Sequence, residues 1–132
     1  MPVVTAEHKG DKLFEVKLEK QTLKVDLPVT SGGKERGPTP TGLCAASLAS
    51  CIAAVVTMHC DSVKIDTTGL TVSMTYDKLE KPSRLGNFRA TIRIPHGQFD
   101  EKRKDAILRA AERCPVHETI RLHSGVEFVL EK

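Results

Sequence analysis

Four cysteines carry most of the reactive chemistry that this sequence offers, and their spacing limits how they can pair. Cys44 and Cys51 are seven residues apart in an apolar segment, and Cys60 follows Cys51 by nine residues. On a helix, residues seven apart share a face but lie about 10 Å apart along the axis, which is too far for a disulfide. If Cys51 has a redox partner, that partner therefore comes from elsewhere in the chain. The candidate is Cys114, which directly precedes a proline.

The segment around Cys51 predicts a long core helix. Residues 37–60 contain no Asp, Glu, Lys or Arg, and residues 41–58 form a pattern that is apolar on all sides. Such a helix is buried, either in a protein core or in a bilayer. Its many Ala, Ser, Cys and Thr residues and its amphipathic flanks favour a core over a membrane. The small residues Ala46, Ser50 and Ala54 would let a neighbouring element approach the backbone closely.

The rest of the chain predicts antiparallel strands and a second helix. Alternating polar and apolar residues indicate strands at 13–18, 22–27, 63–66, 70–76, 88–94 and 126–130. Glycines and prolines make 29–40 a loop. Asp100 is expected to cap a helix from Glu101 to about Cys114, where Pro115 interrupts it. This order predicts one α+β domain over residues 1–132, in which a buried central helix and a second long helix pack against an antiparallel sheet.

Composition and charge exclude several classes of function. The chain has 132 residues, a net charge of +3 with basic and acidic residues interleaved, and 4% aromatic residues. This composition argues against nucleic-acid binding, which uses massed basic residues and stacking aromatics. The N-terminus lacks the pattern of a signal peptide, so we expect a cytoplasmic protein without a membrane anchor. Cysteines in a reducing compartment are more often buried, metal-bound or redox-active than permanently bridged.

Two motifs resemble those of the OsmC/Ohr family of thiol-dependent hydroperoxide reductases. The segment Pro-Thr-Gly-Leu-Cys-Ala-Ala-Ser-Leu-Ala-Ser-Cys, which ends at Cys51, is similar to the proline-initiated helix that ends its motif in the peroxidatic cysteine. The segment Cys-Pro-Val-His, which begins at Cys114, resembles the motif of the second cysteine. The Gly-Gly pair at 32–33 and the order of elements agree with the resemblance.

The resemblance implies a function and a set of partners. Cys51 would attack a peroxide and become a sulfenic acid, which Cys114 would convert to a disulfide. The substrates would be organic hydroperoxides, in some members hydrogen peroxide, and the reductant an external dithiol or thiol. Family members form intertwined homodimers, and the apolar surface expected here also exceeds what one chain can cover. The resemblance implies no cofactor and no metal. A small apolar pocket of Leu43, Leu48 and Ile52 would suit an organic tail.

The sequence departs from the family at the group that activates the thiol. Thr41 stands where the organic-peroxide branch has a glutamate, and only Lys9 and Lys12 are present where that branch has an arginine. A thiol at its ordinary pKa of about 8.5 is mostly protonated at neutral pH, so Cys51 needs a nearby cation. Arg36 is the first candidate for this role. The alternatives are Arg84, Arg89 and Arg93.

Four other interpretations remain open at this point. Cys44 and Cys60 are expected to be buried structural residues, as cysteines often are. His117 is more often a turn or surface histidine than an acid–base group. A metal site could use Cys51, Cys114 and His117 with His59 or Cys60, although the spacing differs from that of zinc sites. The chain could also be a binding domain that keeps the family fold without its catalysis.

Overall fold

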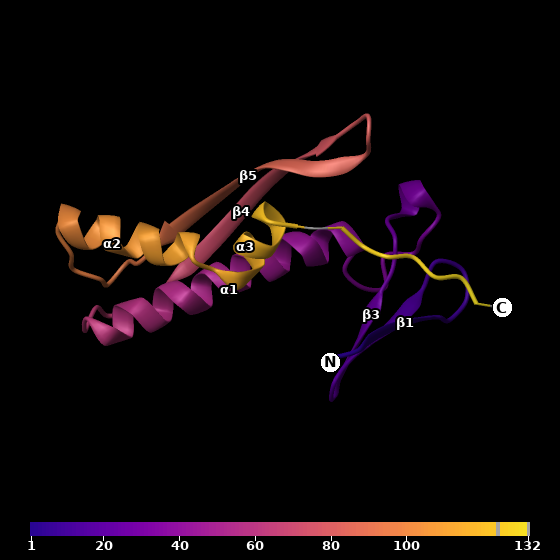
Figure 1. Ribbon diagram of the computed structural model, residues 1–132, viewed down its shortest axis with the longest axis horizontal. Coiled ribbons are helices and arrows are strands. Elements are labelled where there is room, and N and C mark those ends of the chain that lie inside the picture. The colour runs from indigo at the N-terminus through magenta and orange to yellow at the C-terminus, as the bar shows by residue number, and fades with distance from the viewer. Residues whose placement is uncertain (124, 132) are drawn as a thin grey trace. The chain divides into compact units, whose positions relative to one another are not determined.

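The computed structural model describes residues 1–123 and 125–131. The chain divides into two compact units, which we call unit 1 (Met1–Ala46) and unit 2 (from Ser47 onward). Helix α1 (Pro40–Ser62) begins in unit 1 and continues into unit 2 (Figure 1). The predicted α+β class is confirmed, since the chain consists of antiparallel strands and helices.

Unit 1 contains a three-stranded antiparallel sheet in the order β1-β2-β3. Strand β1 is Val4–His8, β2 is Phe14–Leu18 and β3 is Gln21–Val25. The strands expected at 13–18 and 22–27 are therefore confirmed to within two residues. The first strand was not predicted, because its Val-Thr-Ala-Glu-His sequence alternates only weakly. Its register with β2 pairs His8 with Phe14, and their rings lie 5.5 Å apart.

The loop after β3 is organised around the buried carboxylate of Asp26, whose side chain is fully shielded from solvent. This carboxylate accepts hydrogen bonds from the backbone amides of Leu27, Lys34 and Arg36 and from the Arg36 guanidinium. The loop also contains a short 3₁₀ turn, Val29–Ser31. A side chain at Gly33 would clash with the Leu27 carbonyl oxygen, so the loop packs too tightly for any larger residue there.

Helix α1 begins and ends with recognisable caps. The Thr39 hydroxyl accepts a hydrogen bond from the Gly42 amide at 3.0 Å, and Pro40 occupies the first helical position, where its missing amide costs nothing. At the other end, Lys64 adopts a left-handed conformation with φ of 61°. The amides of Val63 and Ile65 bond back to the Cys60 carbonyl. The strand predicted at 63–66 is therefore wrong: these residues close the helix, and their alternation serves to bury Ile65.

In this chain α1 is buried along one face instead of on all sides. Leu48, Ile52, Val56 and Cys60, spaced four apart, are buried, whereas Ala54 and Met58 on the opposite face are exposed. By length and composition alone the helix could cross a membrane. Its packed face instead forms the centre of a protein core, as the small-residue composition indicated.

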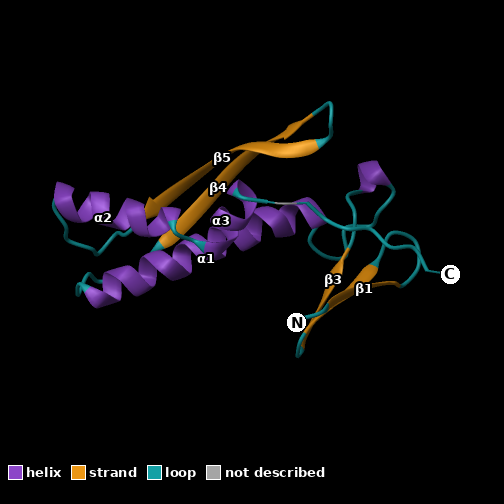
Figure 2. Cartoon of the chain, in the orientation of Figure 1, coloured by secondary structure: helices purple, strands orange, loops and turns teal. Residues whose placement is uncertain are grey.

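Unit 2 builds that core from α1, a β-hairpin and two further helices (Figure 2). Strands β4 (Thr71–Leu79) and β5 (Arg84–Arg93) pair antiparallel, and alternate residues such as Val72, Phe88 and Ile92 pack on the core. Helix α2 (Glu101–Glu112) is capped by Asp100, which accepts from the Arg103 amide at 2.8 Å, as predicted. Helix α3 (Pro115–Arg121) follows directly after Cys114.

The strand predicted at 126–130 is wrong for the single chain. The described residues 125–131 form no strand, and the side chains of Phe128 and Leu130 are 89% and 98% exposed. A strand exists only when a neighbouring strand satisfies its backbone hydrogen bonds. The alternating pattern therefore indicates a capacity to pair, which this chain does not use on itself.

Candidate functional site

The structure brings Cys51 and Cys114 together, although they are far apart in sequence. Cys51 lies in the middle of α1 and is half-buried, and Cys114 lies fully buried at the junction between α2 and α3. Their side chains are hydrogen-bonded, and both belong to the core cluster of unit 2. Both are reduced. Two reduced sulfurs in contact are placed to form a disulfide when one of them is oxidised.

The surroundings of Cys114 keep its thiol protonated. Burial raises the pKa of Cys114, and the hydrogen bond with Cys51 raises it further, because the protonated thiol is the donor. The backbone amides of His117 and Val116 act in the opposite direction, although neither completes a capping hydrogen bond to the sulfur. Cys114 is thus held as a neutral donor that faces Cys51.

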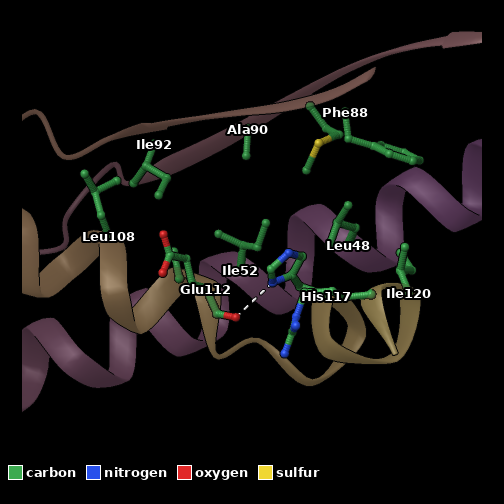
Figure 3. A pocket seen from close by; sticks show the side chains of 12 residues that line it. Leu48, Ile52, Phe88, Ala90, Ile92, Leu108, Glu112, His117 and Ile120 are labelled. Atoms are coloured by element: carbon green, nitrogen blue, oxygen red, sulfur yellow. Dashed lines mark hydrogen bonds between the residues drawn. The ribbon is translucent and has the colours of Figure 1, made fainter. Parts of the chain in front are cut away.

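A pocket of about 520 Å³ opens beside the cysteine pair within unit 2 (Figure 3). Phe88, Ala90 and Ile92 of β5 line one side of it, and Leu48 and Ile52 of α1 line the other. The remaining lining residues are Met74, Leu108, Ala111, Glu112, His117, Ile120 and Arg121. Neither cysteine lines the pocket, but Ile52, the neighbour of Cys51 in α1, does, and so does His117, whose backbone amide is directed at Cys114. Of the residues expected to form a pocket, Leu48 and Ile52 line it, and Leu43 belongs to unit 1.

The polar groups of the pocket all come from α2 and α3. His117 Nδ1 lies 2.8 Å from the Glu112 carbonyl oxygen, and Arg121 Nη2 lies 2.8 Å from Glu118 Oε2. The Arg121 guanidinium lowers the pKa of Glu118, which keeps that carboxylate ionised. The sequence did not mark Glu112 or Arg121 as pocket residues. Their positions depend on how α2 and α3 meet β5, which no local pattern reveals.

The family model described as OsmC-like protein matches residues 32–131 of the chain. The chain belongs to the OsmC-like family. Both cysteines of the pair fall within the matched residues. No curated protein matches the chain at a significant level.

Solved structures share the fold of this OsmC-like protein over nearly its whole length. A Psychrobacter arcticus protein named for osmotic stress induction and a detoxification response has 26% identity and a TM-score of 0.81, with 90% of this chain and 88% of that chain covered. The organic hydroperoxide resistance protein OsmC of Legionella pneumophila has 23% identity and a TM-score of 0.67, with coverage of 92% and 89%. OhrB of Bacillus subtilis, an organic hydroperoxide resistance protein, has 19% identity and a TM-score of 0.63, with coverage of 93% and 92%.

The arginines predicted to activate Cys51 in this OsmC-like protein have other partners or positions. Arg36 Nε lies 2.7 Å from the buried Asp26 carboxylate in unit 1, and this ion pair lowers the pKa of Asp26. Arg84 donates to the carbonyls of Glu80 and Pro82 at the hairpin turn. Arg89 and Arg93 alternate with the pocket-lining residues of β5, so they lie on the other face of the hairpin. An effect of Arg36 on Cys51 stays a prediction.

The other cysteines and the alternative metal site have different outcomes. Cys60 is fully buried as expected, and burial raises its pKa, whereas Cys44 is exposed, contrary to expectation. Cys44 lies near the start of α1, in unit 1, outside the core cluster that buries the later turns of the helix. Within residues 1–123 and 125–131, no group of three or more His, Cys, Asp or Glu side chains is placed to hold a metal ion. The alternative site of Cys51, Cys114 and His117 with His59 or Cys60 is therefore not assembled.

Proposed function

We propose that this OsmC-like protein is a thiol-dependent peroxidase that acts in oxidative stress defence. The Cys51 thiolate attacks the terminal oxygen of a hydroperoxide, the O–O bond breaks, and an alcohol leaves while Cys51 becomes a sulfenic acid. Cys114 then attacks the sulfenic sulfur, which releases water and forms a Cys51–Cys114 disulfide. An external dithiol or thiol reduces the disulfide by exchange and restores both thiols.

The contact between the two sulfurs is the observation that carries this proposal. A resolving thiol must reach the sulfenic sulfur without unfolding the protein, and Cys114 is hydrogen-bonded to Cys51 in the reduced state. Family membership and the structural similarity to organic hydroperoxide resistance proteins support the same chemistry.

The pocket supports an organic hydroperoxide as the substrate class. Most of its lining residues are apolar, and they include Ile52, next to Cys51 in α1, and His117, three residues after Cys114. An organic tail buried there would gain about 25 cal/mol per Å² of apolar surface removed from water. Hydrogen peroxide has no tail to bury, so it would react more slowly.

The consumption of cumene hydroperoxide with a dithiol present tests the proposal. Cys51→Ser should abolish consumption, because no other residue takes over the attack. Cys114→Ser should complete one turnover and leave a sulfenic acid that a dimedone probe traps. Cys44→Ala is the matched control and should keep activity within a few-fold. Activity in Cys51→Ser equal to that of the unmodified protein would refute the assignment.

We also propose that the protein works as a homodimer. The C-terminal segment exposes Val126, Phe128, Val129 and Leu130, and α1 exposes Met58 on the face away from the unit 2 core. Light scattering at micromolar concentration should give twice the chain mass of 14.5 kDa. A monomer under these conditions would refute the dimer and leave the peroxidase proposal intact.

A further inference from the structure

His117 is held in a defined orientation at the pocket. Its Nδ1 lies 2.8 Å from the Glu112 carbonyl oxygen, which can only accept a hydrogen bond. Nδ1 therefore carries the hydrogen and donates it, and in the neutral ring Nε2 keeps a free lone pair. Figure 3 shows this second nitrogen pointing into the pocket, away from the Glu112 carbonyl. The ring thus presents a proton acceptor, or after protonation a proton donor, to whatever occupies the pocket.

His117 is also close to the cysteine pair. Cys114 caps α3, and His117 lies in the first turn of that helix with its backbone amide directed at the Cys114 sulfur. Residues three apart in a helical turn lie about 5–6 Å from each other. A hydroperoxide with its tail in the pocket and its terminal oxygen at Cys51 would therefore carry its second oxygen towards His117.

We propose that His117 transfers the proton that the departing alkoxide requires, a role that rests on the proposed peroxidase function. The Cys51 thiol first gives its proton to His117 Nε2, which produces a thiolate and an imidazolium. The thiolate then takes the terminal peroxide oxygen, the O–O bond breaks, and its electron pair leaves on the alkoxide oxygen. The imidazolium protonates that oxygen to an alcohol. Atoms and charges balance, since the thiol proton ends on the alcohol and His117 returns to its neutral form.

The charged groups around His117 are compatible with a proton shuttle. Glu118 Oε1 lies 3.8 Å from Nδ1, and Arg121 pairs with the same carboxylate. From α2, Glu112 lines the pocket, and from α1 the nearby ionisable group is Cys51. The pocket residues contributed by β4 and β5, Met74, Phe88, Ala90 and Ile92, are apolar. Arg121 cannot replace His117 as the donor, because an arginine does not release its proton in proteins.

The test compares two oxidants in single turnovers of the full chain, tert-butyl hydroperoxide and peracetic acid. The first releases an alkoxide, which needs a proton, and the second releases acetate, which does not. Formation of the thiolate affects both reactions equally, so it cancels in the ratio of the two rates. His117→Gln should lower the ratio of the alkyl hydroperoxide rate to the peracid rate by about ten-fold or more, because general acid catalysis typically contributes 10²–10⁴-fold.

Control measurements separate the possible failures. His96→Gln, an exposed histidine beside Asp66, should leave the ratio unchanged. In the unmodified protein the solvent deuterium isotope effect should be larger for tert-butyl hydroperoxide than for peracetic acid, because only the first reaction needs a proton on its leaving group, and this needs no variant to fold. An unchanged ratio in folded His117→Gln, or equal solvent isotope effects for the two oxidants in the unmodified protein, would overturn the role of His117. If the unmodified protein reduces neither oxidant, the peroxidase proposal itself fails.

Discussion

Oxidation with one equivalent of tert-butyl hydroperoxide should join Cys51 to Cys114 and stabilise unit 2. The two thiols already interact with each other in the core of unit 2, so we expect the bond to form with little movement of α1 or of the α2–α3 junction. Cys114 is fully buried, so forming the disulfide does not require a surface side chain to move into the core. We therefore expect the native state to accommodate the disulfide without distortion. The disulfide should stabilise the protein mainly by lowering the conformational entropy of the unfolded chain.

The size of the effect follows from the loop that the disulfide closes. Cys51 and Cys114 are about 63 residues apart in sequence. The loss of unfolded-state entropy for a loop of about 63 residues corresponds to about 4 kcal/mol at 25 °C, and native disulfides typically contribute 2–4 kcal/mol. With a urea m-value of about 2 kcal/mol/M, typical of this chain length, the urea midpoint should rise by roughly 1–2 M.

Urea unfolding followed by circular dichroism measures this difference between reduced and oxidised protein. Tryptic peptide mapping under non-reducing conditions identifies which cysteines are joined. The oxidised Cys114→Ser variant should show no stabilisation, and oxidised Cys44→Ala should behave like the unmodified protein. A verified Cys51–Cys114 disulfide that lowers the midpoint would refute the reasoning, because it would mean that the sulfurs meet only after the fold is distorted.

Three further outcomes follow from the structure. The free energy of unfolding of the reduced protein should fall above pH 8.5, because burial raises the folded-state pKa of Cys60 and Cys114 above the unfolded value. In urea titrations between pH 8 and 10, Cys60→Ala should make this fall in stability less steep. Asp26→Asn should lower the urea midpoint at pH 7, because the lowered pKa of Asp26 contributes stability above pH 4. The difference in urea midpoint between the variant and the unmodified protein should narrow as pH falls below 4, and a difference independent of pH would contradict the Arg36 ion pair. Ala90→Phe should fill the pocket and slow the reduction of cumene hydroperoxide by about ten-fold or more, while the rate of hydrogen peroxide reduction changes by less than about three-fold. Thr91→Phe, on the opposite face of β5, should leave both rates unchanged.

The elements that sequence reasoning located correctly are those with signals inside a few residues. Asp100 caps α2 because its carboxylate reaches the amide three residues on, and this needs no distant partner. Strands β2 to β5 follow from alternation along the chain. The same local pattern misled at residues 63–66, where it buries one side chain at a helix end, and at 126–130, where it indicates a strand that has no neighbour in this chain.

For the candidate site, the sequence identified the reactive residues, but the tertiary structure decided which of them meet. The types and motifs of Cys51 and Cys114 made both candidates, but their contact depends on how α1 packs against the α2–α3 junction. The sequence did not reveal that the buried Asp26 pairs with Arg36, since the two residues are ten positions apart and only the folded loop brings their charges together. Caps, turns and periodicity are determined by neighbouring residues, so the sequence alone predicts them. Which thiol, cation or histidine faces another depends on packing between distant elements, and only the tertiary structure decides it.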